Sequence, residues 1–195
     1  MATATLKPKT RKPRIWTEEE YLDHPGGCLI EFDHGRVERL PMPDEFHQTV
    51  SFNLQLALHS YARERKLGKV LAAPFPVKVS DQKYREPDLV FRSTKLPKTN
   101  PETTQFWDRV TLAVEVMSRG SKSRNRDQIE KRNEYAAAGI AEYWIVDLKK
   151  KEITVLNLRR GEYIETGAYR IGDVARSTVL SPFEISLESV FSTKE

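Results

Sequence analysis

A short apolar run with one acidic residue in it, Thr111 to Met117, constrains this sequence most. The run is too short for a buried helix, so it predicts a strand that is covered on both faces. Glu115 lies inside the run, and a buried carboxylate is costly unless a cation or hydrogen-bond donors meet it. We therefore expect the fold to place donors, a positive charge or a metal ion beside Glu115.

A second acidic residue, Asp88, stands at the start of another apolar run. If this strand pairs with residues 111–117, the carboxylates of Asp88 and Glu115 converge at one end of a sheet. Such oxygen ligands suit Mg²⁺, with Mn²⁺ as a substitute, and leave coordination positions open for water and phosphate. Two simpler explanations stay open. Asp88 could bond a local amide at the strand entry, and Glu115 could pair with Arg85 or Arg109.

The chain between this strand and the next apolar run, Glu142 to Asp147, predicts a short helix. Asn125 is the expected N-cap, which places Asp127 in the first turn and Lys131 one turn later on the same face. The Lys131 ammonium could orient a water or stabilise charge that builds on a phosphate. The alternative is an ordinary solvent-exposed ion pair between Asp127 and Lys131.

A loop rich in serine and basic residues precedes this helix. Because it is adjacent to the acids, it could hold a phosphodiester backbone through charge and hydroxyl contacts. A solvated loop without a ligand explains the same composition. The basic residues of the loop are Arg119, Lys122, Arg124 and Arg126.

The net charge of +4 arises in the N-terminal tail. Residues 1–14 carry five basic residues and no acid, which leaves −1 for the rest of the chain. We expect this tail to be disordered, as either a solubilising extension or an arm that attracts DNA. Residues 15–195 are enough for one domain. The single cysteine, the lack of a long apolar run and the lack of a signal-peptide core predict a cytoplasmic protein without membrane contact.

The pattern along the chain predicts an α/β domain with a mixed central sheet flanked by helices. The elements between residues 45 and 147 follow the order αβββαβ. A β-hairpin around Asp33-His34-Gly35 precedes this core, and extra C-terminal strands follow it. The expected ranges are a capped helix at 17–23, hairpin strands at 28–32 and 36–40, a helix from 44 to 68, strands at 70–79, 86–91, 111–117, 142–147 and 152–158, and a final helix at 185–191.

Several of these segments are similar to those of a known family. The chain resembles the Uma2 family of the PD-(D/E)xK restriction-endonuclease-like superfamily over residues 16–190. The similarity implies a restriction-endonuclease-like core. The motifs that carry it are Glu86-Pro87-Asp88-Leu89-Val90-Phe91, Ala113-Val114-Glu115-Val116-Met117-Ser118, Asp127-xxx-Lys131, Tyr135-xxx-Gly139 and Glu142-Tyr143-Trp144-Ile145-Val146-Asp147.

The resemblance also implies roles for individual residues. Asp88 matches the aspartate of the PD motif and Glu115 the acid of the (D/E)xK motif, so both would hold Mg²⁺ together with the carbonyl of Val116. Met117 stands where the superfamily has its lysine. We expect Lys131, on the following helix, to supply that lysine. Accessory roles are implied for three further residues, Glu31, Asp127 and His47.

These observations together predict a Mg²⁺-dependent endonuclease that hydrolyses DNA phosphodiester bonds with a metal-activated water. A rival hypothesis, which Met117 favours, is a nuclease-fold DNA-binding protein without turnover that works with a mobile element or a partner subunit. A third hypothesis is a structural domain without nucleic-acid function, for which the near-neutral body is the best support. By analogy with restriction-like folds, we expect a homodimer.

Overall fold

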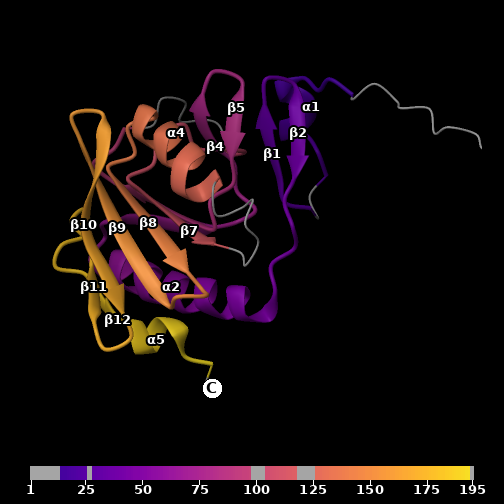
Figure 1. Cartoon of the computed structure of the whole chain (residues 1–195). Coiled ribbons are helices and arrows are strands. Elements are labelled where there is room, and N and C mark those ends of the chain that lie inside the picture. The colour runs from indigo at the N-terminus through magenta and orange to yellow at the C-terminus, as the bar shows by residue number, and fades with distance from the viewer. Residues whose placement is uncertain (1–13, 26–27, 98–103, 118–125, 194–195) are drawn as a thin grey trace, which may run out of the picture.

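The structure, a computed structural model, describes residues 14–25, 28–97, 104–117 and 126–193. Its central feature is a six-stranded mixed sheet (Figure 1). In spatial order the strands are β10 (Glu162–Arg170), β9 (Glu152–Arg159), β8 (Glu142–Asp147), β7 (Leu112–Met117), β6 (Leu89–Ser93) and β3 (Gly68–Ala72). β7 and β8 run parallel, whereas the other neighbours are antiparallel. The predicted mixed sheet is therefore confirmed.

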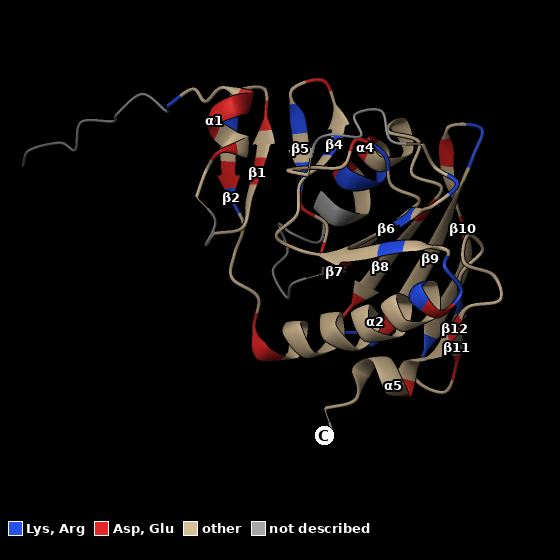
Figure 2. Cartoon of the chain, turned by 180° about the vertical axis from the view of Figure 1, so that it is seen from behind, with Lys and Arg blue, Asp and Glu red and all other residues tan. Residues whose placement is uncertain are grey.

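Helices cover both faces of this sheet. α2 (Glu45–Glu64) and α5 (Leu187–Phe191) pack on one face, and α4 (Lys131–Ala137) packs on the other (Figures 1 and 2). A π-helical turn, η1 (Arg126–Glu130), leads directly into α4. β7 and β8 are buried along their whole length, as expected for a parallel pair between two helical layers. The order α2-β3-β6-β7-α4-β8 confirms the predicted αβββαβ core.

A second, four-stranded sheet lies beside the N-terminal helix α1 (Glu18–Leu22). Its strands, in spatial order, are β2 (Arg36–Arg39), β1 (Ile30–Asp33), β5 (Lys83–Arg85) and β4 (Val77–Ser80). The predicted hairpin is confirmed, since β1 and β2 are antiparallel and joined by His34 and Gly35. Both turn residues have positive φ, at 46° and 82°, as the I′ class of hairpin turns requires.

Two features of the predicted strand pattern were wrong. The single strand expected at 70–79 is divided, because β3 belongs to the central sheet and β4 to the second sheet. Pro74 and Pro76 lie in the break, where their missing N–H groups disrupt no ladder. The strand expected at 86–91 begins only at Leu89, and the preceding strand β5 was not predicted.

The N-terminal caps predicted for α1 and α2 are confirmed, but the end expected at residue 68 is wrong, because α2 ends at Glu64 and Gly68 begins β3. The capping box of α1 is confirmed, with reciprocal hydrogen bonds between Thr17 and Glu20. Asp44 caps α2 through the amide of His47. The predicted N-cap at Asn125 lies outside the described residues. The last strands and helix are β11 (Val174–Arg176), β12 (Glu184–Ser186) and α5.

The N-terminal tail is described only from Arg14 onward. The Arg14 guanidinium lies 4.3 Å from the ring centre of Trp16 and 2.6 Å from the Glu20 carboxylate. Residues 1–13 lie outside the described residues, so the expectation that the tail is disordered stays a prediction. No helix within the described ranges has the length and apolar character needed to cross a membrane.

Candidate active site

Asp88 immediately precedes the first residue of β6. The neighbouring strand β7 extends beyond β6 at this end of the sheet. The last pair of the two strands here joins Leu89 to Val114, so Glu115 and Val116 extend beyond the paired residues. The Asp88 carboxylate takes the place of a ladder partner, since its Oδ2 accepts a hydrogen bond from the Val116 N–H at 2.7 Å. Asp88 therefore bonds an amide of the neighbouring strand, at the end of the sheet where Glu115 also lies.

His47 approaches the same point from the first turn of α2. Its Nε2 lies 2.8 Å from the Val116 carbonyl oxygen and 3.5 Å from Asp88 Oδ1. Burial alone would lower the pKa of His47, but the hydrogen bond and charge of Asp88, aided by the Val116 carbonyl, raise the pKa above its ordinary value. The accessory position expected for His47 thus lies in contact with Asp88 and Val116.

Glu115 is met by two donors from α4. Its Oε1 accepts hydrogen bonds from Lys131 Nζ at 2.8 Å and from the Tyr135 hydroxyl at 2.6 Å. Burial and the charge of Glu115 raise the pKa of Tyr135 well above its ordinary value, so the hydroxyl stays a donor. Lys131 is only 1% exposed. The alternative of a solvent-exposed pair between Asp127 and Lys131 is therefore wrong for Lys131.

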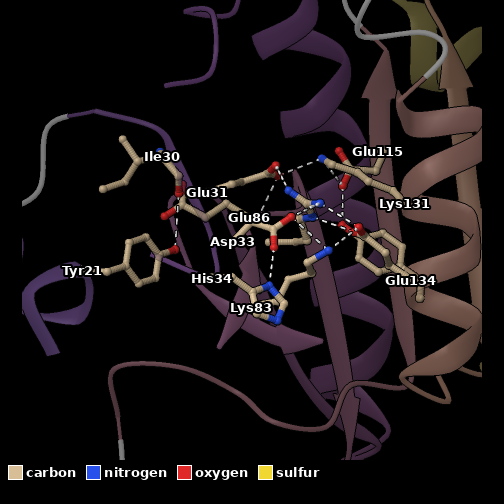
Figure 3. A network of polar contacts seen from close by, with 12 residues as sticks. Tyr21, Ile30, Glu31, Asp33, His34, Lys83, Glu86, Glu115, Lys131 and Glu134 are labelled. Atoms are coloured by element: carbon tan, nitrogen blue, oxygen red, sulfur yellow. Dashed lines mark hydrogen bonds and ion pairs between the residues drawn. The ribbon is translucent and has the colours of Figure 1, made fainter. Parts of the chain in front are cut away.

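Glu31 holds Lys131 from the other side (Figure 3). Its Oε1 lies 3.0 Å from Lys131 Nζ, and its Oε2 lies 3.0 Å from Arg85 Nη1. The side chain of Glu31 is fully buried. Arg85 in turn forms a two-pronged ion pair with Glu134, with both distances at 2.7 Å. This buried network joins the N-terminal hairpin to α4.

Three residues of this network were not predicted as site residues: Arg85, Glu134 and Tyr135. Glu134 and Tyr135 stand three and four residues after Lys131, so they share its helix face. That spacing was a usable signal in the sequence. Arg85 was named only as an alternative partner for Glu115, and the structure places it against Glu31 and Glu134.

Glu86 is a further buried acid beside the network. Its Oε2 accepts a hydrogen bond from the Ile30 N–H at 3.3 Å. Burial raises the pKa of Glu86 from 4.5 to about 7, and the nearby charge of Glu31 acts in the same direction. Because the folded state favours the protonated form, stability is expected to fall as the pH rises through this interval.

We therefore expect Glu86→Gln to stabilise the protein most above neutral pH. The amide keeps an acceptor for the Ile30 N–H but carries no charge to bury. Urea unfolding of both proteins at about pH 5 and about pH 8 should show the advantage of Glu86→Gln growing by up to about 3 kcal/mol. An advantage that does not change with pH would contradict the raised pKa.

The basic loop falls largely outside the described residues. This holds for Arg119, Lys122 and Arg124. Arg126 and Asp127 belong to η1, but their side chains are not described. Contacts of this loop with a nucleic acid, and the accessory role of Asp127, therefore stay predictions.

The end of the sheet at Asp88 carries ligand groups of the kind that a hard cation prefers. Two carboxylates, from Asp88 and Glu115, and the carbonyl of Val116 are all oxygen ligands, as Mg²⁺ prefers. Across the described part of the chain, no group of three or more His, Cys, Asp and Glu side chains could hold a metal ion. An ion here would depend on two carboxylates, a carbonyl and water, which is an ordinary arrangement for Mg²⁺.

Comparison with known proteins decides the family. The family model described as "Putative restriction endonuclease" matches residues 18–188. The chain belongs to the Uma2 family. Glu31, Asp88, Glu115 and Lys131 of this Uma2 chain all lie within the matched range. No curated protein matches the chain.

A solved structure supports the fold of this Uma2 chain. The crystal structure of a "putative nuclease belonging to DUF820" from Anabaena variabilis matches it with a TM-score of 0.70 and 14% sequence identity. The match covers 89% of this chain and 96% of that chain. At this level of identity the likeness concerns the fold, and it agrees with the nuclease-like architecture predicted from the sequence.

Proposed function

We propose that this Uma2 protein is a metal-dependent endonuclease that hydrolyses phosphodiester bonds in DNA. The observation that carries the proposal is the Lys131 ammonium, buried and 2.8 Å from Glu115 Oε1. Asp88, bound to the Val116 N–H, lies at the same end of the sheet. Buried charges are costly to a fold, and catalytic sites are places where proteins retain them.

Asp88, Glu115 and the carbonyl oxygen of Val116 would hold Mg²⁺, with Mn²⁺ as a substitute. When bound, the ion would activate a water and offset negative charge on the phosphate. His47 and Asp88 together hold the Val116 backbone in position, because His47 Nε2 donates to the Val116 carbonyl oxygen and the Val116 N–H donates to Asp88 Oδ2. The basic loop would contact the phosphate backbone in this proposal.

Lys131 takes the role of the motif lysine in this proposal. Met117, at the motif position, is buried in the apolar core beneath α4. Lys131 reaches Glu115 from the next helix instead, and Glu31 and Glu115 together fix its ammonium. A positive charge held in this way can orient a water or stabilise charge that develops on the phosphate.

Plasmid cleavage tests the proposal. Purified wild-type protein is incubated with supercoiled plasmid in Mg²⁺, in Mn²⁺ or in EDTA, and its folding is checked by circular dichroism. We expect nicked or linear DNA with either metal and intact plasmid in EDTA. Folded protein that binds DNA in a salt-dependent manner but leaves it intact with both metals would overturn the nuclease and favour the binding protein.

The homodimer and the cytoplasmic location stay predictions of the sequence.

A further inference from the structure

A pocket of about 350 Å³ opens beside the candidate active site. Asp88 and His47 belong to its lining, so the pocket borders that site. One wall is a face of α2, and the other includes Met42 and Pro74. Besides His47, the α2 residues in the lining are Gln48, Ser51, Phe52 and Gln55.

The spacing of these four α2 residues places them on one helix face. They recur at intervals of three and four residues, next to the face that carries Val50 and Leu54 into the core. Unlike those core residues, Phe52 is 60% exposed. An exposed aromatic ring therefore stands at the edge of the pocket, flanked by two side-chain amides.

The described lining of the pocket carries little charge. α2 has no Asp, Glu, Lys or Arg between Glu45 and Arg63, and its middle is drawn without charged residues in Figure 2. Among the residues that the structure describes, the lining includes no lysine or arginine, and its acidic residue is Asp88. From the described lining a phosphate group would meet the Asp88 carboxylate and no basic side chain. The lining instead suits a neutral, flat ligand with hydrogen-bonding edges.

We propose that this pocket binds one unstacked nucleobase of the substrate strand. The proposal rests on the proposed nuclease function and narrows its substrate to strands with an unpaired base, either single-stranded or bulged. The base would stack on the Phe52 ring, and the amides of Gln48 and Gln55 would bond its edge. The phosphate beside that base would then lie outside the pocket, near the cation that Asp88 and Glu115 would hold in the proposed function.

Binding of oligonucleotides in EDTA tests this proposal without cleavage. Fluorescence anisotropy measures the dissociation constants of a single strand and of a duplex of the same length. We expect wild type to prefer the single strand, and Phe52→Ala to weaken single-strand binding on the order of tenfold while changing duplex binding little. The matched control is Leu56→Ala, because Leu56 is also exposed and lies one turn further along α2, outside the pocket lining. It should behave as wild type.

Three results would overturn the proposal. The first is that Phe52→Ala and Leu56→Ala bind the single strand with equal affinity. The second is that wild type does not prefer the single strand to the duplex, or does not bind it measurably. The third is a change in molecular mass of Phe52→Ala by light scattering with unchanged affinity, which would assign this face to a second copy of the chain. Cleavage of the same single strand with Mg²⁺ or Mn²⁺ separates the two proposals: single-strand binding that depends on Phe52 without metal-dependent cleavage of that strand retains the pocket and rejects the nuclease.

Discussion

Replacement of Asp88 by asparagine is expected to lower metal-dependent cleavage by a factor of about 1,000 or more. In the wild-type structure the Val116 N–H donates a hydrogen bond to Asp88 Oδ2 at 2.7 Å. The amide oxygen of asparagine can still accept this bond, so the fold should be kept. The substitution removes the negative charge that would hold the cation. Glu115→Gln is expected to reduce cleavage in the same way. Rates of plasmid nicking with Mg²⁺ and with Mn²⁺ measure both effects.

A surface carboxylate supplies the matched control for this experiment. Asp173 is exposed in the turn between β10 and β11, where its Oδ2 accepts a hydrogen bond from the Arg170 N–H. Asp173→Asn makes the same chemical change away from the site and should cleave as wild type does. Cleavage by Asp88→Asn and Glu115→Gln at the rate of Asp173→Asn would show that these acids have no role in the reaction.

Glu31→Gln is expected to destabilise the protein by about 3–5 kcal/mol, a cost typical of breaking a buried ion pair. The Glu31 carboxylate is fully buried and lies 3.0 Å from both the Lys131 ammonium and the Arg85 guanidinium. A neutral amide leaves these two buried cations with less negative charge. For a chain of this size the midpoint of thermal unfolding should fall by roughly 10 °C.

An exposed ion pair gives the matched control. Glu184 lies 3.3 Å from Arg176, and both side chains are more than half exposed. Glu184→Gln should cost less than about 1 kcal/mol, because solvent screens such pairs. Urea denaturation of both variants measures the difference. If Glu31→Gln unfolds at the same urea concentration as Glu184→Gln, the buried network does not stabilise the fold.

A double-mutant cycle isolates the contact between Glu31 and Lys131. Because the two charges are in contact, the cost of Glu31→Gln should be smaller in a Lys131→Met background than in wild type. Costs that simply add would contradict direct coupling.

Several parts of this site followed from local sequence patterns. The apolar run around Glu115 predicted a strand buried on both faces, and the cost of burying its carboxylate predicted a partner, found as Lys131 and Tyr135. The hairpin turn at His34 and Gly35 followed equally from residue type. These features depend on the apolar character and periodicity of the side chains and on backbone conformation over a few residues. All of these are local properties.

Other parts depended on contacts between distant segments. Residues 70–79 read as one strand, yet Pro74 and Pro76 separate two strands that belong to different sheets. The resemblance implied an accessory role for Glu31, and the position of the hairpin against α4 decides its partners, Lys131 and Arg85. Sequence spacing does not reveal such a pairing, because 54 residues separate Glu31 from Arg85.

The periodic pattern of α2 indicates which side of the helix is buried, since Val50 and Leu54 recur at helical spacing. It does not indicate that the next face, with the exposed Phe52, borders a pocket whose lining includes Asp88. Local patterns thus determined the strands, the helices and the acids that need partners. Long-range packing decided which partners they meet and which surfaces stay open, because the sheet order brings together segments that are far apart in the chain.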